Sequence, residues 1–260
     1  MNKFAGKTAL VTGASSGIGE SITRQLAEKH CNLILVARRE DKLNALKHEL
    51  ETQYDITVTT ISHDLATLEA GKSLHKKTLA LGLDVDILIN NAGYAKHGPF
   101  HLTPLDTHID MMHLLTTTLT ELTYLYSEDM KRLGGGYILL VASIAGFMPI
   151  PQFATYAASK AFVLSLGESL SKELSEFNIN VTTLCPGGTA TEFMDVSGQN
   201  ITGFRRHAIM TSDAVAQAGL RAVAKGKSVI VPGLLYKISM ASLRAVPRGL
   251  QAMIGEAATK

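Results

Sequence analysis

Short apolar runs alternate with stretches of helical periodicity along most of the chain. The apolar runs are nearly continuous and rich in β-branched residues, which is typical of parallel strands covered by helices on both faces. They occupy residues 7–12, 32–37, 57–61, 86–90, 136–142, 179–185 and 227–231. Helical periodicity lies between them, as at residues 18–30, 40–53, 66–82, 105–133 and 155–176. This order predicts one doubly wound Rossmann-type α/β domain over residues 1–260, with a mainly parallel seven-stranded sheet and helices on both faces.

Composition and charge narrow the partners that we expect. The 260 residues carry a formal net charge of +2, which argues against nucleic acid as an obligatory partner. The two cysteines and nine histidines lack the spacings of a zinc site, so we expect no metal. Because the chain shows neither the apolar run of a signal peptide nor one long enough to span a membrane, we expect a cytoplasmic protein.

A glycine-rich segment joins the first expected strand to the first expected helix. Its candidate binding residues are Gly13, Ser15, Ser16, Gly17, Ile18 and Gly19. Gly13 permits a tight turn, Gly17 lets a pyrophosphate approach the backbone, and Gly19 lets the helix pack on the strand. The helix N-terminus adds free N–H groups and a favourable dipole. A structural turn is the alternative, but this position predicts a dinucleotide-binding loop with GxxxGxG spacing.

The end of the second strand indicates which dinucleotide is bound. An acidic residue at this point would accept a hydrogen bond from the ribose 2′-hydroxyl of NAD. The sequence instead has Ala37, followed by Arg38 and Arg39, whose guanidinium groups suit a 2′-phosphate. Two solvated arginines at a helix start are the alternative. We expect NADP(H) to be preferred over NAD(H).

Ser143, Tyr156 and Lys160 form the candidate catalytic set. Tyr156 and Lys160 are four residues apart, so a helix places both on one face, and Ser143 lies where the fifth strand ends. A phenol with an ordinary pKa of about 10 is a poor acid–base group at neutral pH, but a neighbouring ammonium would lower that pKa. We expect Tyr156 to exchange a proton with a substrate oxygen, Lys160 to lower its pKa, and Ser143 to orient that oxygen.

Together these motifs resemble the short-chain dehydrogenase/reductase family, in its branch of roughly 250 residues with TGxxxGIG and YxxxK motifs. The matching segments, in family order, are TGxxxGIG at 12–19, Asp64-Leu65, Asn90-Asn91-Ala92-Gly93, Ser143, Tyr156-Ala-Ala-Ser-Lys160 and Pro186-Gly187. The resemblance covers nearly the whole chain. It implies a carbonyl–alcohol oxidoreductase that forms a homodimer or homotetramer through its fourth and fifth helices.

The resemblance also implies roles for further residues in holding the cofactor. Asp64, with Leu65 beside it, would meet the adenine. Asn91 and Ala92, with Gly93 after them, would border the adenosine ribose. Lys160 would bind the nicotinamide ribose next to Tyr156. The carboxamide would be flanked by Pro186, Gly187, Thr189 and Thr191.

One position departs from the family pattern. Many members have an asparagine in the fourth helix whose peptide carbonyl helps to hold a water of the proton relay, and Leu115 aligns with it here. Leucine keeps the carbonyl but lacks the amide, and an α-helix turns Thr116 and Thr117 away from that direction. Either the relay is completed differently or turnover is reduced.

Two C-terminal segments bear on the substrate. Residues 192–212 match the family's substrate lid, and we expect apolar residues there and after Ser143 to favour a hydrophobic substrate or to pack in the core. These residues are Phe193, Met194, Val196, Ile201, Phe204 and Met210, with Phe147, Met148, Pro149 and Ile150. Residues 234–254 are basic and amphipathic, with Pro247 kinking or ending a helix. They pack against the domain or a sister subunit, cover the pocket, or touch a membrane surface.

The sequence therefore predicts an NADP(H)-dependent oxidoreductase that interconverts a carbonyl and an alcohol on a hydrophobic small molecule. Two other functions stay open. A cofactor-binding sensor or scaffold with weak turnover is suggested by Leu115. A lipid- or steroid-type reductase at a membrane surface is suggested by the basic segment 234–254.

Overall fold

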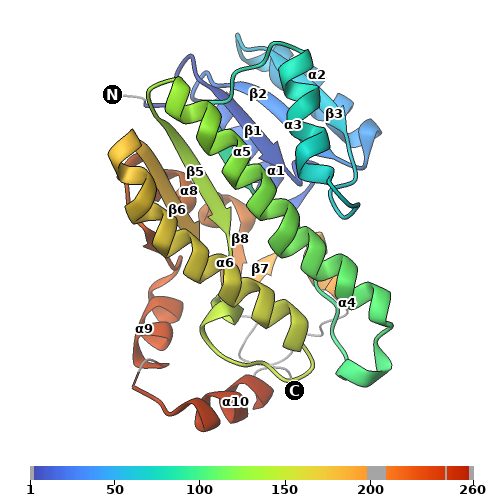
Figure 1. The fold of residues 1–260 in the computed structure, drawn as a ribbon, viewed down its shortest axis with the longest axis vertical. Coiled ribbons are helices and arrows are strands. Elements are labelled where there is room, and N and C mark those ends of the chain that lie inside the picture. Colours follow the sequence, from blue (N-terminus) through green and yellow to red (C-terminus); the bar gives the residue numbers. More distant parts are fainter. Residues whose placement is uncertain (1–2, 198–208, 244, 258–260) are drawn as a thin grey trace.

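A single parallel sheet organises the molecule. The structure is a computed structural model that describes residues 3–197, 209–243 and 245–257. The seven strands lie in the order β3-β2-β1-β4-β5-β6-β9, and all of their pairings are parallel, which confirms the predicted doubly wound fold (Figure 1). The strands are β1 Thr8–Thr12, β2 Asn32–Ala37, β3 Val58–Ser62, β4 Ile87–Asn90, β5 Gly136–Val141, β6 Ile179–Leu184 and β9 Val229–Ile230.

Helices cover both faces of the sheet. They are α1 Gly17–Ala27, α2 Glu40–Gln53, α3 Ala70–Ala80, α4 Leu105–Met112, α5 Leu119–Arg132, α6 Ala154–Glu173, α7 Glu192–Ser197, α8 Ser212–Ala224, α9 Leu234–Leu243 and α10 Arg248–Ala257. Shorter elements are η1 Phe100–Leu102, η2 His113–Thr118, η3 Ile144–Phe147, η4 Leu174–Phe177 and the strand pair β7 Thr189–Ala190 and β8 Met210–Thr211. In Figure 1, α5 and α6 lie in front of the sheet, whereas α1 and α8 lie behind it.

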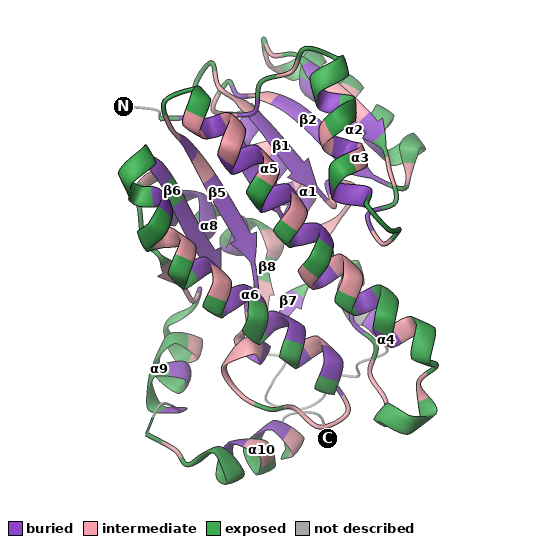
Figure 2. Cartoon of the chain, in the orientation of Figure 1, coloured by how far each residue is buried: buried purple, intermediate pink, exposed green. Residues whose placement is uncertain are grey.

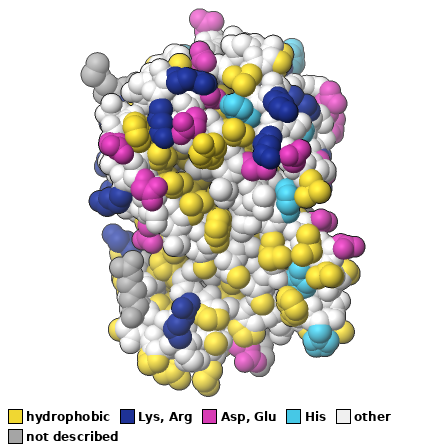
Figure 3. Space-filling model, viewed as in Figure 1, with side chains coloured by type: hydrophobic (Ala, Val, Ile, Leu, Met, Phe, Trp, Pro, Cys, Tyr) yellow, Lys and Arg dark blue, Asp and Glu magenta, His cyan; other side chains and the backbone are white. Residues whose placement is uncertain are grey.

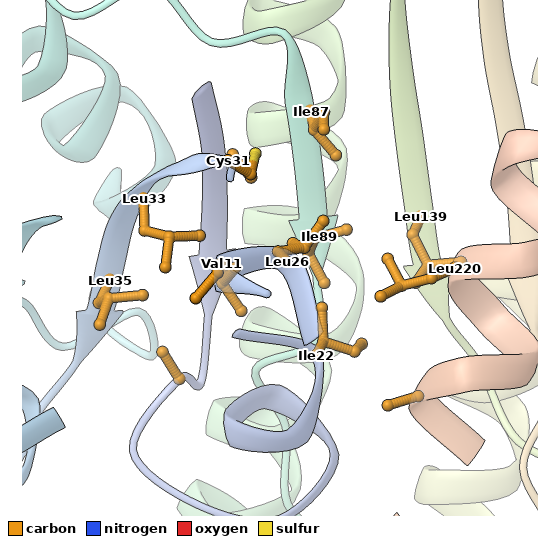
Figure 4. Close-up of a cluster of buried hydrophobic side chains, with 14 of the residues drawn as sticks. Val11, Ile22, Leu26, Cys31, Leu33, Leu35, Ile87, Ile89, Leu139 and Leu220 are labelled. Atoms are coloured by element: carbon orange, nitrogen blue, oxygen red, sulfur yellow. The ribbon is translucent and has the colours of Figure 1, made fainter. Parts of the chain in front are cut away.

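Alternate residues of each strand enter two separate cores. In β1, Val11 joins the core beneath α1, α2 and α8, whereas Leu10 joins the core beneath α3, α5 and α6. Figure 4 shows the first core, where Ile22 and Leu26 of α1 lie against the sheet. Figure 2 shows the strands almost entirely buried and the outer helix faces exposed. Because side chains alternate along a strand, burial on both faces requires the continuous apolar runs of the sequence.

The strand order reverses between β1 and β4, which both lie in the middle of the sheet. The two strands are paired with Val11 opposite Ile89, so their carboxyl ends open at the same edge. Open α/β sheets bind ligands in the crevice at such a reversal. The fold therefore puts the glycine-rich segment after β1 beside the segment after β4.

Two predicted helices differ from the observed ones. The predicted helix at 105–133 is divided into α4, the π-helical segment η2 and α5, so residues after Met112 have a different helical phase from that of an ideal α-helix. The C-terminal segment 234–254 forms two helices, with Pro247 immediately before the start of α10. Pro lacks a backbone N–H, so it suits a helix start and not a helix interior.

Within the described residues, no helix has both the length and the apolar character needed to cross a bilayer.

Candidate active site

One cavity of about 610 Å³ runs along the carboxyl edge of the sheet. All but one of the predicted site residues line it, namely Gly13, Ser15, Ser16, Gly17, Ile18, Arg38, Arg39, Asp64, Leu65, Asn91, Ala92, Gly93, Ser143, Tyr156, Lys160, Pro186, Gly187, Thr189 and Thr191. The exception is Gly19, which is buried. A Cβ on Gly19 would lie 2.2 Å from the carbonyl oxygen of Gly13, so this glycine allows α1 to approach the loop.

The glycine-rich segment is held against the end of β4. Gly13 and Gly17 have φ angles of +66° and +58°, a backbone region that favours glycine. The Asn91 side-chain amide donates to the Thr12 carbonyl oxygen at 2.9 Å, and the Thr12 hydroxyl accepts from the backbone N–H groups of Asn91 and Ala92 at 2.9 and 3.0 Å. These bonds join the two segments into one rigid wall of the cavity.

The arginine end of the cavity comprises Ser15, Arg38, Arg39 and Asp64. Arg38 is exposed, and Arg39 donates from Nη2 to the Ser15 hydroxyl and carbonyl oxygens at 3.1 and 3.3 Å. Arg39 Nη1 also donates to Glu192 of α7 at 2.8 Å. The structure thus brings Arg38 and Arg39 beside the glycine-rich segment, where an anion could be bound.

The tyrosine end comprises Ser143, Tyr156 and Lys160. Ser143 follows β5 and begins η3, where its hydroxyl accepts from the backbone N–H of Ala145 at 3.1 Å. Tyr156 and Lys160 both face this point from α6, and Lys160 Nζ lies 5.7 Å from the centroid of the Tyr156 ring. Lys160 is only 5% exposed, and its ammonium donates to the Val141 carbonyl oxygen at 2.7 Å.

Burial shifts the pKa values of this pair in opposite directions. It raises the pKa of Tyr156 to about 12, partly opposed by a hydrogen bond to Ser143. Burial lowers the pKa of Lys160 to about 8, partly opposed by Cys185. The expected lowering of the Tyr156 pKa by Lys160 is therefore wrong for this structure. The cause is physical: loss of water disfavours both charged forms, and the Lys160 ammonium is bonded to Val141.

Apolar side chains surround the tyrosine end. The Phe193 ring lies 5.7 Å from the Tyr156 ring, and Leu114, Met148, Ile150 and Ile209 also line the cavity. Phe147 instead packs against the core, which was the alternative expectation, and it lines a separate cavity of about 210 Å³ against α9 and α10. Pro149 and Met210 are not among the lining residues. Ile201 and Phe204 lie outside the described residues, as do the side chains of Met194 and Val196.

Tyr236 is a site residue that the sequence interpretation missed. It comes from α9, and its hydroxyl oxygen accepts a hydrogen bond from the backbone N–H of Gly188 at 3.0 Å. A Cβ on Gly187 would lie 2.3 Å from the Tyr236 ring, so that glycine makes room for it. The only sequence signal was that 234–254 was a possible pocket cover. The tertiary packing of α9 against Gly187 and Gly188 places Tyr236 in the site, and no sequence pattern indicates it.

Leu115 lies in the π-helical segment η2 and is 1% exposed. Its Cδ2 would be 2.7 Å from a Cβ on Gly93, so leucine fills the space beside the segment that follows β4. Of the two threonines considered for the relay, Thr117 is exposed and Thr116 donates its hydroxyl to the Met112 carbonyl oxygen. The hydroxyl of the next residue, Thr118, donates to the Leu65 carbonyl oxygen. These hydroxyls are thus committed to backbone groups, and Leu115 acts as a core residue.

Comparison with known proteins identifies the family. The short chain dehydrogenase family model matches residues 7–201. The uncharacterized oxidoreductase YvaG of Bacillus subtilis is 34% identical over 204 residues, which are 76% of this chain and 76% of that protein. A dehydrogenase/reductase SDR family protein 7-like of Drosophila melanogaster is 35% identical over 74% of this chain and 60% of its own length.

Another relative and two solved structures are also dehydrogenases or reductases. A very-long-chain 3-oxoacyl-CoA reductase of Aspergillus clavatus is 36% identical over 68% of this chain but only 52% of that protein, so the chain spans about half of its length. A short-chain dehydrogenase from Sphingobium yanoikuyae in complex with NADPH has 32% identity and a TM-score of 0.84, with 94% of each chain covered. A bulky-bulky ketone specific alcohol dehydrogenase from Comamonas testosteroni has 28% identity and a TM-score of 0.79, covering 94% of this chain and 93% of that one. The chain therefore belongs to the short-chain dehydrogenase/reductase family of oxidoreductases.

Proposed function

We propose that the protein is an NADP(H)-dependent oxidoreductase that interconverts a carbonyl and an alcohol on a hydrophobic small molecule. The observation that carries this proposal is the meeting of Ser143, Tyr156 and Lys160 at the apolar end of a cavity whose other end holds a glycine-rich segment and two arginines. The size of about 610 Å³ is within the roughly 300–1,000 Å³ range of ligand pockets.

The residues present fit a dinucleotide. A Cβ on Gly13 would lie 2.8 Å from the Asn91 side-chain nitrogen, and one on Gly17 would lie 3.0 Å from Thr191, so only glycine allows this close packing of the segment. Both glycines also line the cavity, which leaves their backbone open to a pyrophosphate. Arg38 and Arg39 would hold a 2′-phosphate, and Lys160 would hold the nicotinamide ribose. When bound, the nicotinamide ring supplies or accepts the hydride.

The chain's own residues then manage the substrate oxygen. Ser143 donates a hydrogen bond to the carbonyl oxygen and fixes its position. As the carbonyl carbon gains the hydride, Tyr156 transfers its proton to that oxygen, and the alcohol forms. A phenol with a pKa of about 12 carries this proton at neutral pH, which suits the reduction direction.

The apolar wall favours a bulky hydrophobic ketone. Phe193, Met148 and Ile150 line the cavity beside Tyr156. The named relatives include a bulky-bulky ketone specific alcohol dehydrogenase and a very-long-chain 3-oxoacyl-CoA reductase, which supports the same substrate class.

Cys31 and Cys185 are buried free thiols, which suits the proposed cytoplasmic location.

A carbonyl and alcohol panel, run with NADPH, NADH and their oxidised forms, tests the proposal through nicotinamide fluorescence. We expect NADPH to be consumed faster than NADH, and fastest with bulky apolar ketones. Tight NADPH binding without turnover on any carbonyl would contradict the enzyme assignment and support a sensor or scaffold.

A reductase that works at a lipid surface is a second candidate, because the C-terminal helices expose apolar and basic side chains together. The exposed residues are Leu234, Leu235, Lys237, Ile238, Arg248, Leu250, Met253 and Ile254. Such a surface would bind anionic vesicles through both kinds of group. The wild type should sediment together with phosphatidylserine vesicles, whereas an Ile238→Asp variant should stay in the supernatant. Equal sedimentation of both would contradict this contact.

The proposed assembly is a homodimer or homotetramer through the predicted fourth and fifth helices, which correspond to α4 with α5 and to α6. Leu105, Ile109 and Met112 of α4 and Tyr124 of α5 are between 40% and 70% exposed. In Figure 3 hydrophobic side chains gather over the lower half of this face, whereas charged side chains lie mostly over the upper half. Exposed apolar patches of this kind mark protein interfaces. A monomer in sedimentation velocity would contradict this assembly.

A further inference from the structure

Glu192, the first residue of α7, bridges two cations from another part of the chain. Its Oε2 accepts from Arg39 Nη1 at 2.8 Å, and its Oε1 accepts from Lys42 Nζ at 2.9 Å. Each carboxylate oxygen therefore has its own cation. Arg39 precedes α2 and Lys42 lies in its first turn, so the two pairs join the start of α2 to the start of α7.

One of these cations, Arg39, belongs to the arginine end of the cavity. Arg39, Arg38 and Glu192 all line it, and Arg39 also donates to the Ser15 hydroxyl of the glycine-rich segment at 3.1 Å. Under the proposed function, a 2′-phosphate is recognised here. An internal carboxylate thus already pairs with a cation that an incoming phosphate would need.

Protonation does not relieve this competition. The cations Lys42 and Arg39 lower the pKa of Glu192 to about 2, so its carboxylate stays charged throughout the physiological pH range. A dinucleotide with a free 2′-hydroxyl leaves both ion pairs intact. A dinucleotide with a 2′-phosphate has to share or displace the pair with Arg39, and it also meets the negative charge of Glu192.

We propose that Glu192 is a cofactor-specificity residue, which competes with the 2′-phosphate for Arg39 and so limits the preference for NADP(H) over NAD(H). This inference rests on the proposed function, because it assumes that the arginine end receives the adenosine part of the cofactor. A residue that merely positioned Arg39 for the phosphate would have the opposite effect when its charge is removed. The sign of the change therefore separates the two roles.

The test is Glu192→Gln, which removes the charge and keeps the shape. Glu69→Gln is the matched control, because Glu69 makes an exposed ion pair with Lys72 and does not line the cavity. Affinities for NADPH and NADH are measured by nicotinamide fluorescence, and those for adenosine 2′-phosphate and adenosine 5′-phosphate by calorimetry. The two fragments report on recognition without any turnover.

We expect Glu192→Gln to bind NADPH and adenosine 2′-phosphate about two- to fivefold more tightly, which is the range for exposed ion pairs. NADH, adenosine 5′-phosphate and the Glu69→Gln variant should stay within experimental error of the wild type. An unchanged or lower ratio of NADPH to NADH affinity in Glu192→Gln would overturn the role of Glu192. Equal wild-type affinities for NADPH and NADH would instead contradict the proposed cofactor preference, and the Glu192→Gln ratio would still decide the inference.

Discussion

The two ends of the cavity hold their functional side chains in different ways. At the tyrosine end, Lys160 is 5% exposed, its ammonium is bonded to Val141, and burial moves the pKa values of Tyr156 and Lys160. At the arginine end, Arg38 is exposed and Arg39 lies in an ion-pair network at the surface with Glu192 and Lys42. Water screens the charges at the arginine end, but it is largely excluded from the charges at the tyrosine end.

This difference indicates that, under the proposed function, the tyrosine end controls proton transfer and the arginine end controls the choice of cofactor. Proton transfer requires groups whose pKa values respond strongly to their surroundings, and burial supplies that response. Cofactor choice requires only modest differences in binding, which exposed ion pairs can tune. Changes at the tyrosine end should therefore alter the chemistry strongly, whereas changes at the arginine end should alter selectivity more gently.

Tyr156→Phe should have the largest effect. It removes the proposed proton donor while keeping the ring, so kcat should fall by about 10²- to 10⁴-fold, the contribution of general acid–base catalysis. NADPH affinity, measured by fluorescence titration, should stay nearly unchanged. Turnover close to that of the wild type would place the proton transfer elsewhere.

Leu115→Asn should mainly change stability. The side chain is 1% exposed and fills the space beside Gly93, so the variant loses apolar burial and gains a buried amide. The free energy of unfolding should fall by about 2–4 kcal/mol, measured by urea denaturation. Leu115→Met is the volume-matched control and should cost less than about 1.5 kcal/mol. Undiminished stability with a higher kcat would show instead that asparagine completes a proton relay.

Arg38→Asp should change the choice of cofactor. It reverses an exposed charge that lines the arginine end, so NADPH affinity should fall by about tenfold while NADH affinity changes little. Arg221→Asp makes the same charge change in α8, away from the cavity lining, and should leave both affinities unaltered. A parallel loss of NADPH and NADH affinity in Arg38→Asp would contradict recognition of a 2′-phosphate.

The pH dependence of binding gives the most gradual expected effect. The pKa of Lys160 is lowered to about 8, so its ammonium is present below this pH and lost as pH rises above it. A bound ribose favours the ammonium, and NADPH affinity should therefore decline above about pH 8 by at most tenfold per pH unit. Lys160→Met keeps the stem but not the charge, and its affinity should be flat over the same range. An equal decline in both proteins would assign the titration to another group.

Local pattern was enough to predict much of this molecule. The apolar runs predicted the strands to within one or two residues, because a strand buried on both faces has to be apolar throughout. Ser143, Tyr156 and Lys160 meet at one place because a four-residue spacing lies on one helix face and parallel strands end at one edge of the sheet. Motif spacing alone was therefore sufficient to bring the candidate site together.

Features that depend on contacts between distant segments were missed or wrong. Tyr236 reaches Gly188, and Glu192 reaches Arg39 and Lys42, but no periodicity in the sequence pairs these residues. The direction of the Tyr156 pKa shift also depends on how completely neighbouring elements exclude water. By itself the sequence determined which segments form the strands of the sheet, which motifs follow those strands, and which residues form the candidate catalytic set. Only the tertiary structure decided which charges are buried, which are screened and which side chains close the cavity, because burial and long-range contact arise from the packing of the whole chain.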